Sequence, residues 1–151
     1  VYGVRDTSQI LNPVTVLAST SDLAALEWIE SNTPEDARFY INVKPWQTGV
    51  YRGVDGGWWI LPMTGRETLV PATMYVLGDL SYVNGINDWA DRATKLTGCT
   101  PEFYSLLADA NLNYLYLKES QGNLQKEALA GCPGLQAVYS KDNITIIKVV
   151  P

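Results

Sequence analysis

Residues 55–70 (DGGWWILPMTGRETLV) concentrate the side chains best suited to recognising a ligand. Asp55, Trp58, Trp59 and Arg66 lie close together in sequence, and two glycines precede the paired tryptophans. Glycine lets the backbone bend where other residues cannot, and tryptophan offers a flat apolar face with one polar N–H. This combination predicts a shaped surface that meets something flat, such as a sugar ring, a lipid head group or another domain. The alternative is that the indoles fill the core beside a turn.

The preceding segment, residues 44–54, contributes two further aromatic side chains to the same region. Loops at the ends of strands often carry function because a rigid scaffold positions them. We therefore expect one surface groove, lined by six candidate ligand-binding residues: Trp46, Tyr51, Asp55, Trp58, Trp59 and Arg66.

Several kinds of chemistry are excluded or disfavoured by composition. The chain has no histidine, which removes Ser-His-Asp and Cys-His catalysis and histidine metal sites. Its Gly-rich stretch, residues 53–57, lacks the spacing of dinucleotide- and phosphate-binding loops. Asp79, Asp88 and Asp91 could meet a divalent cation, although a solvated acidic face explains them better. We predict no catalytic residue, no metal and no cofactor in this chain.

The overall balance of residues describes a globular domain. The chain has 151 residues, 46% hydrophobic and 18% charged, with a net charge of −5. That length suffices for one sizeable core. The acidic balance argues against nucleic acid, whose binders usually carry a basic face, and against an anionic membrane surface. Cys99 and Cys132 are too far apart for a CxxC motif, so both a disulfide and two free thiols remain open.

The hydrophobic pattern alternates helices with strands. Helices are expected after Ser19 to about residue 32, over 82–96 and from Thr100 to 110, with a short one at 124–130. Strands are expected at 39–43, 68–70 and 114–117, and 135–139 and 144–150 form a hairpin. Residues 44–54 are expected to be a long loop, and Trp89 falls on an apolar stripe typical of core.

This order predicts an α/β fold with a mixed, mostly parallel sheet of about four to five strands, flanked by helices and ending in a C-terminal β-hairpin. Residues 19–151 are expected to form a single domain, and residues 1–18 a lead-in from an upstream membrane region.

Three segments, residues 26–37, 55–60 and 64–68, resemble the soluble C-terminal region of GT-C-type membrane glycosyltransferases. The oligosaccharyltransferase catalytic subunit is the best-known relative, and uncharacterised membrane proteins of Chloroflexi-like bacteria are more similar still. On this register Asp55 and Gly57 take the Asp and Gly of the family's WWDYG motif. Gly53 and Val54 replace its two tryptophans, and Gly56 its tyrosine. In that family the motif binds the hydroxyl residue of the acceptor sequon. Because these residues differ, recognition of a sequon is not expected here.

The resemblance implies an accessory domain on the extracytoplasmic face of a bacterial membrane, not catalytic alone. The family's catalytic carboxylates lie in membrane-proximal loops outside this segment. The implied partner is a sugar or lipid-linked sugar, reached through a parent protein whose upstream region holds it in the membrane. The alternative is a stand-alone carbohydrate-binding or protein-interaction module, and a small enzyme using carboxylates is the third reading.

Overall fold

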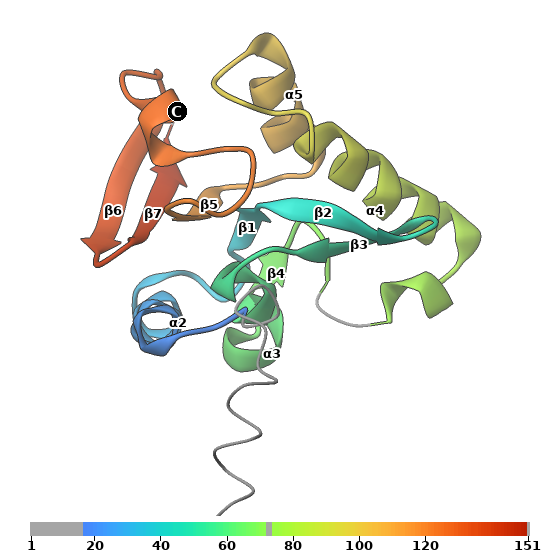
Figure 1. Cartoon of the computed structure of the whole chain (residues 1–151), viewed down its shortest axis with the longest axis horizontal. Coiled ribbons are helices and arrows are strands. Elements are labelled where there is room, and N and C mark those ends of the chain that lie inside the picture. Colours follow the sequence, from blue (N-terminus) through green and yellow to red (C-terminus); the bar gives the residue numbers. More distant parts are fainter. Residues whose placement is uncertain (1–16, 72–73, 151) are drawn as a thin grey trace, which may run out of the picture.

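The computed structural model describes residues 17–71 and 74–150 (Figure 1). Residues 1–16, which make up most of the expected lead-in, lie outside the described part of the chain. The main helices and strands follow the order that the sequence predicts, with two additions: a hairpin after β1 (Arg38–Ile41) and the short helix α3 (Ile60–Thr64).

A five-stranded mixed sheet forms the centre of the fold, in the order β4-β1-β5-β7-β6. Strand β1 is parallel to β4 and β5, whereas β7 is antiparallel to β5 and β6. The mixed sheet and its C-terminal hairpin are therefore confirmed, with two of the four pairings parallel. The strands are β1 (Arg38–Ile41), β4 (Glu67–Thr68), β5 (Tyr114–Lys118), β6 (Leu135–Lys141) and β7 (Ile144–Val149).

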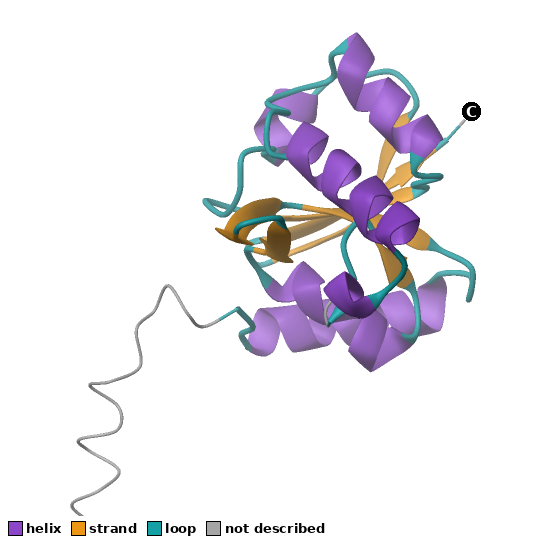
Figure 2. Ribbon diagram, turned by 90° about the vertical axis from the view of Figure 1, so that its right-hand side faces the viewer, coloured by secondary structure: helices purple, strands orange, loops and turns teal. Residues whose placement is uncertain are grey.

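Helices cover both faces of this sheet (Figure 2). Helices α2 (Thr20–Asn32) and α3 (Ile60–Thr64) lie on one face, and α4 (Leu80–Ala93) and α5 (Pro101–Asp109) on the other (Figure 1). The N–H of Ser19 donates to Asp22 at 2.6 Å, which caps α2. Thr100 caps α5 through its side chain, with Pro101 in the first turn.

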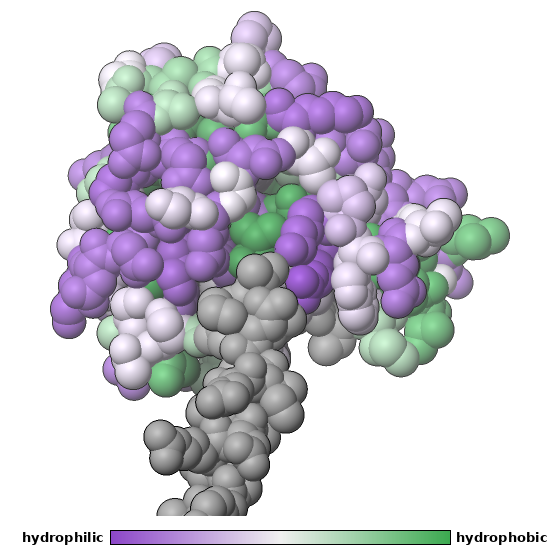
Figure 3. Space-filling model, viewed as in Figure 1, coloured by the Kyte–Doolittle hydropathy of each residue, from purple (hydrophilic) through white to green (hydrophobic). Residues whose placement is uncertain are grey.

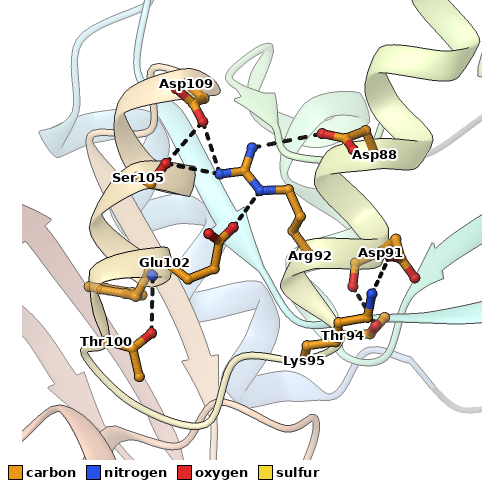
Figure 4. Close-up of polar contacts among 10 residues, drawn as sticks. Asp88, Asp91, Arg92, Thr94, Lys95, Thr100, Glu102, Ser105 and Asp109 are labelled. Carbon is orange, nitrogen blue, oxygen red and sulfur yellow. Dashed lines mark hydrogen bonds and ion pairs between the residues drawn. The ribbon is translucent and has the colours of Figure 1, made fainter.

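Arg92 joins the two helices on the second face (Figure 4). Its guanidinium lies 2.5 Å from Glu102 and 2.9 Å from Asp109 on α5, and 3.7 Å from Asp88 on its own helix. Asp91 pairs with Lys95 one turn further along. These acidic side chains therefore face basic partners, and no cluster of metal-ligating residues exists within the described ranges.

The segment expected to be a loop contains a two-stranded antiparallel hairpin, β2 (Val43–Gln47) and β3 (Val50–Gly53). Pro45 suggests a loop because it cannot donate to a ladder, yet the hairpin forms around it. The Tyr51 N–H donates to the Tyr75 hydroxyl at 2.8 Å, and that hydroxyl donates to Asn87 on α4 at 2.8 Å. Tyr75 therefore fixes the hairpin against α4.

Cys99 and Cys132 form a disulfide, with their Cα atoms 6.1 Å apart. The bridge links the segment between α4 and α5 to the start of the C-terminal hairpin.

Short 3-10 helices complete the described elements: η2 (Gly56–Trp59), η3 (Tyr75–Leu77) and η4 (Lys126–Leu129). The last replaces the short helix expected at 124–130. Within residues 17–71 and 74–150, no helix has both the length and the apolar character needed to cross a membrane.

Candidate functional site

Three of the six predicted site residues line one groove of about 240 Å³. We call it the aromatic groove. Trp46 and Tyr51 come from the β2–β3 hairpin, Trp58 comes from η2, and Tyr75 comes from η3. Its remaining lining is mainly apolar: Gln47, Val50, Pro71, Met74 and Val76.

The aromatic groove combines fixed and exposed rings. Trp46 is 60% exposed, and the Arg52 guanidinium carbon lies 5.9 Å from its ring centroid. Trp58 is half-buried because it packs on Gly53, where an added Cβ would lie 2.8 Å from the Trp58 Cβ. The hydroxyl of Tyr75 is held by its two hydrogen bonds. The aromatic groove therefore has one largely exposed indole, Trp46, beside the more buried rings of Tyr51, Trp58 and Tyr75.

Asp55 is fully buried and does not line the aromatic groove. Its Oδ1 accepts from the Gly57 N–H at 2.9 Å, so it caps η2. Burial raises the pKa of Asp55 to about 7, against the opposing effect of the Gly57 hydrogen bond. Its Oδ2 has no hydrogen-bond partner among the described residues. The geometry assigns Asp55 a structural position.

Arg66 is also buried and lies away from the groove. Its guanidinium donates to the carbonyls of Glu30 at 2.9 Å and Thr33 at 3.0 Å, and to that of Thr64 at 2.5 Å. It therefore caps the end of α2, whose last carbonyls have no partner within the helix. Trp59 is 41% exposed outside the groove. The expectation of one groove lined by all six residues is corrected to three.

A buried polar network lies where β5 ends, and it was not expected from the sequence. The Asp22 carboxylate accepts from the Tyr116 hydroxyl at 2.6 Å and from Lys118 Nζ at 2.5 Å. Burial alone would raise the pKa of Asp22, but hydrogen bonds from Lys118, Ser19 and Tyr116 outweigh it and lower that pKa. The available sequence signal was Lys118, which directly follows the apolar strand predicted at 114–117. The bonds from Tyr116 and Lys118 tie α2 to the sheet.

An exposed apolar ridge adjoins the aromatic groove. Four exposed side chains form it, from the residue before η3, from η3 itself and from the start of α4: Met74, Val76, Leu77 and Leu80. Figure 3 shows hydrophobic atoms at the right-hand edge, where Figure 1 places these elements and the tip of the β2–β3 hairpin. Exposed apolar patches of this kind often mark contact surfaces.

The groove's residue types support binding better than catalysis. The described residues that line it include no carboxylate, lysine or cysteine. General acid–base or nucleophilic chemistry uses such groups or tyrosine, and burial raises the pKa of both lining tyrosines, Tyr51 and Tyr75, away from neutrality. Its aromatic faces and apolar walls instead suit a ligand with a flat or apolar surface.

Comparison with known proteins supports the fold. No protein-family model matches the chain, and no curated protein matches it in sequence. Among solved structures, it is similar to the C-terminal globular domain of an oligosaccharyltransferase from Archaeoglobus fulgidus. The TM-score is 0.51 at 12% identity, over 87% of this chain and 98% of that one. The chain therefore has the α/β fold of an oligosaccharyltransferase C-terminal globular domain.

Proposed function

We propose that this chain is the extracytoplasmic accessory domain of a GT-C-type membrane glycosyltransferase-like protein. The observation that carries the proposal is the fold, since the similarity spans nearly the whole of the archaeal domain. The proposed role is to shape a donor or acceptor site, with catalysis supplied by other parts of a parent protein.

Two features of the described residues support this role. The Cys99–Cys132 disulfide suits an oxidising, extracytoplasmic compartment. The aromatic groove and the apolar ridge lie together at one end of the molecule, at the β2–β3 hairpin and η3. A binding groove beside an exposed apolar surface fits a domain that works against a membrane-bound partner or a lipid-linked sugar.

The test compares groove tryptophans with a tryptophan outside the groove. In membranes containing the complete gene product, transfer from lipid-linked sugar should fall by about tenfold, a barrier increase of roughly 1.4 kcal/mol, in Trp46→Ala and in Trp58→Ala. Trp59→Ala, which removes a partly exposed indole elsewhere, should leave transfer unchanged. The 151-residue chain alone should show no transfer.

Transfer by the isolated chain, or equal loss in all three variants, would contradict the proposal. The alternative, a stand-alone carbohydrate-binding or protein-interaction module, predicts a complete gene product that lacks membrane spans. Protease accessibility of the domain in sealed cells tests the extracytoplasmic location directly.

A further inference from the structure

A second cleft, of about 480 Å³, lies at the β4 edge of the sheet, between β4 and helix α4. Arg38, Glu67, Tyr82, Gly85 and Trp89 line it, and we call it the edge cleft. It shares only Pro71 with the aromatic groove among their described lining residues. Its volume falls in the usual range for small-molecule sites.

Arg38 and Glu67 place complementary polar groups in the edge cleft. The Arg38 Nε lies 3.1 Å from a Glu67 carboxylate oxygen, and the two side chains are 26% and 62% exposed. A guanidinium has five N–H donors, so one carboxylate leaves donors for a ligand. Glu67, being the more exposed partner, keeps acceptor capacity on its open side.

The aromatic lining supplies an apolar surface beside this pair. Trp89 is half-buried, and the guanidinium carbon of Arg38 lies 5.9 Å from its ring centroid. Tyr82 is exposed, and Ile86 forms part of the floor. The apolar stripe of α4 predicted Trp89 as core, and it does pack against the core while also lining the cleft.

The charge balance favours a neutral ligand. Arg38 and Glu67 are the charged residues among the described lining, and their charges cancel. A pyranose ring matches the lining, because its hydroxyls can accept from the guanidinium and donate to the carboxylate. Its C–H face can pack on an aromatic ring, whose face is electron-rich.

We propose that the edge cleft binds a neutral saccharide, with Arg38 and Glu67 bonding its hydroxyls and Trp89 and Tyr82 contacting its apolar face. An extended peptide pairing with β4 is less well matched, because that strand has just two residues, Glu67 and Thr68. So short an edge offers few backbone hydrogen bonds to a peptide. The proposal does not depend on the glycosyltransferase role.

Gly85 provides a sharp test. A Cβ added there would meet no atom within 4 Å, so the position faces open space. Gly85→Leu should therefore fill the cleft while favouring the helix, since glycine weakens helix interiors. Asn84→Leu, at the adjacent exposed position outside the cleft, is the matched control.

The measurement is a ¹H–¹⁵N NMR titration of the 151-residue chain with maltose, cellobiose and N,N′-diacetylchitobiose, followed at the Gly85 amide and the Trp89 indole. At least one saccharide should shift both signals. Its affinity should fall by about tenfold or more in Gly85→Leu, a loss of roughly 1.4 kcal/mol, and stay unchanged in Asn84→Leu. Arg38→Lys keeps the positive charge but loses the planar guanidinium with its several N–H donors, so it should weaken binding too.

Three results would overturn the proposal. The first is that none of the saccharides shifts these signals in the wild-type chain. The second is that Gly85→Leu and Arg38→Lys bind as tightly as wild type. The third is that a capped Val-Thr-Val-Thr peptide shifts the signals and the saccharides do not, which would assign the edge to strand pairing.

Discussion

Lys118 at the end of β5 and Asp22 in the first turn of α2 form a buried ion pair, with Nζ and Oδ2 2.5 Å apart. Their side chains are 6% and 0% exposed. Ser19 and Tyr116 donate to the same carboxylate, so both of its oxygens have partners. The pair joins the first described helix to the centre of the sheet.

Removing one member of this pair should destabilise the fold strongly. Lys118→Met leaves the Asp22 carboxylate buried without its counter-ion, which typically costs about 3–5 kcal/mol. The double variant Lys118→Met, Asp22→Leu removes both charges and should recover part of that loss. Urea unfolding of the two variants measures the difference. A loss in the double variant equal to or larger than that of Lys118→Met alone would contradict the expected recovery.

The pKa of Asp55 predicts an unusual pH dependence. Burial raises this pKa to about 7 in the folded state, against about 3.9 in an unfolded chain. Between those values the folded protein retains a proton that the unfolded chain has released, so the stability contribution of Asp55 falls as pH rises. The wild-type chain should therefore lose stability between about pH 4 and pH 7, and the loss should level off above pH 7.

Asp55→Asn should remove most of that dependence. The amide carbonyl can still accept from Gly57, but it carries no charge at any pH. The variant should be more stable than wild type at pH 8, by on the order of 3 kcal/mol, and the gap should shrink toward pH 5. Asp36→Asn, at an exposed turn, is the control. A gap that stays constant with pH would show that Asp55 does not titrate in this range.

Arg66 should behave as a structural residue. Arg66→Met leaves the carbonyls of Glu30 and Thr33 without their donor, and each lost hydrogen bond to a charged group is typically worth about 1.5–3 kcal/mol. We expect a large fall in the thermal unfolding temperature and, below that temperature, no change in the NMR signal of the Trp46 indole. Lys141→Met, which removes an exposed charge, should have little effect.

The disulfide should contribute measurably to stability. Cys99 and Cys132 are separated by 33 positions, and closing a loop of that size stabilises a fold by about 3–4 kcal/mol on the chain-entropy model. The paired Cys99→Ser, Cys132→Ser variant should unfold at correspondingly lower urea. Thiol titration of the denatured, unreduced chain should find no reactive thiol, and two reactive thiols would contradict the bridge.

Local chemistry was sufficient to predict most of the elements. Ser19 and Asp22 match a capping box, which predicts the start of α2. Thr100 followed by Pro101 is typical of a helix start and predicts α5. Residues 140–143 are a turn sequence, which predicts the final hairpin. The β2–β3 hairpin was missed because Pro45 weakens the strand pattern, and its support comes from Tyr75, distant in sequence. Tertiary contacts of that kind leave no local signal.

The candidate site residues also fall into two groups, those whose position residue type predicts and those whose position depends on tertiary packing. Three of the predicted aromatic side chains line the aromatic groove, as expected: Trp46, Tyr51 and Trp58. Asp55 and Arg66 are polar residues beside glycines, a pattern shared by ligand-binding and backbone-capping positions. Their burial decides between the two, and burial depends on how α2 and η2 pack, which residue types alone do not encode.

Strand β7 is the last described strand in the chain, yet it lies inside the sheet, between β5 and β6. During synthesis, a nascent chain that has emerged as far as β5 has no partner for that strand's second edge. The edge can be covered only when residues 144–149 leave the ribosome. Chains interrupted before that point would expose an apolar strand edge, a recognised route to aggregation. Completion of this sheet therefore requires residues 144–149.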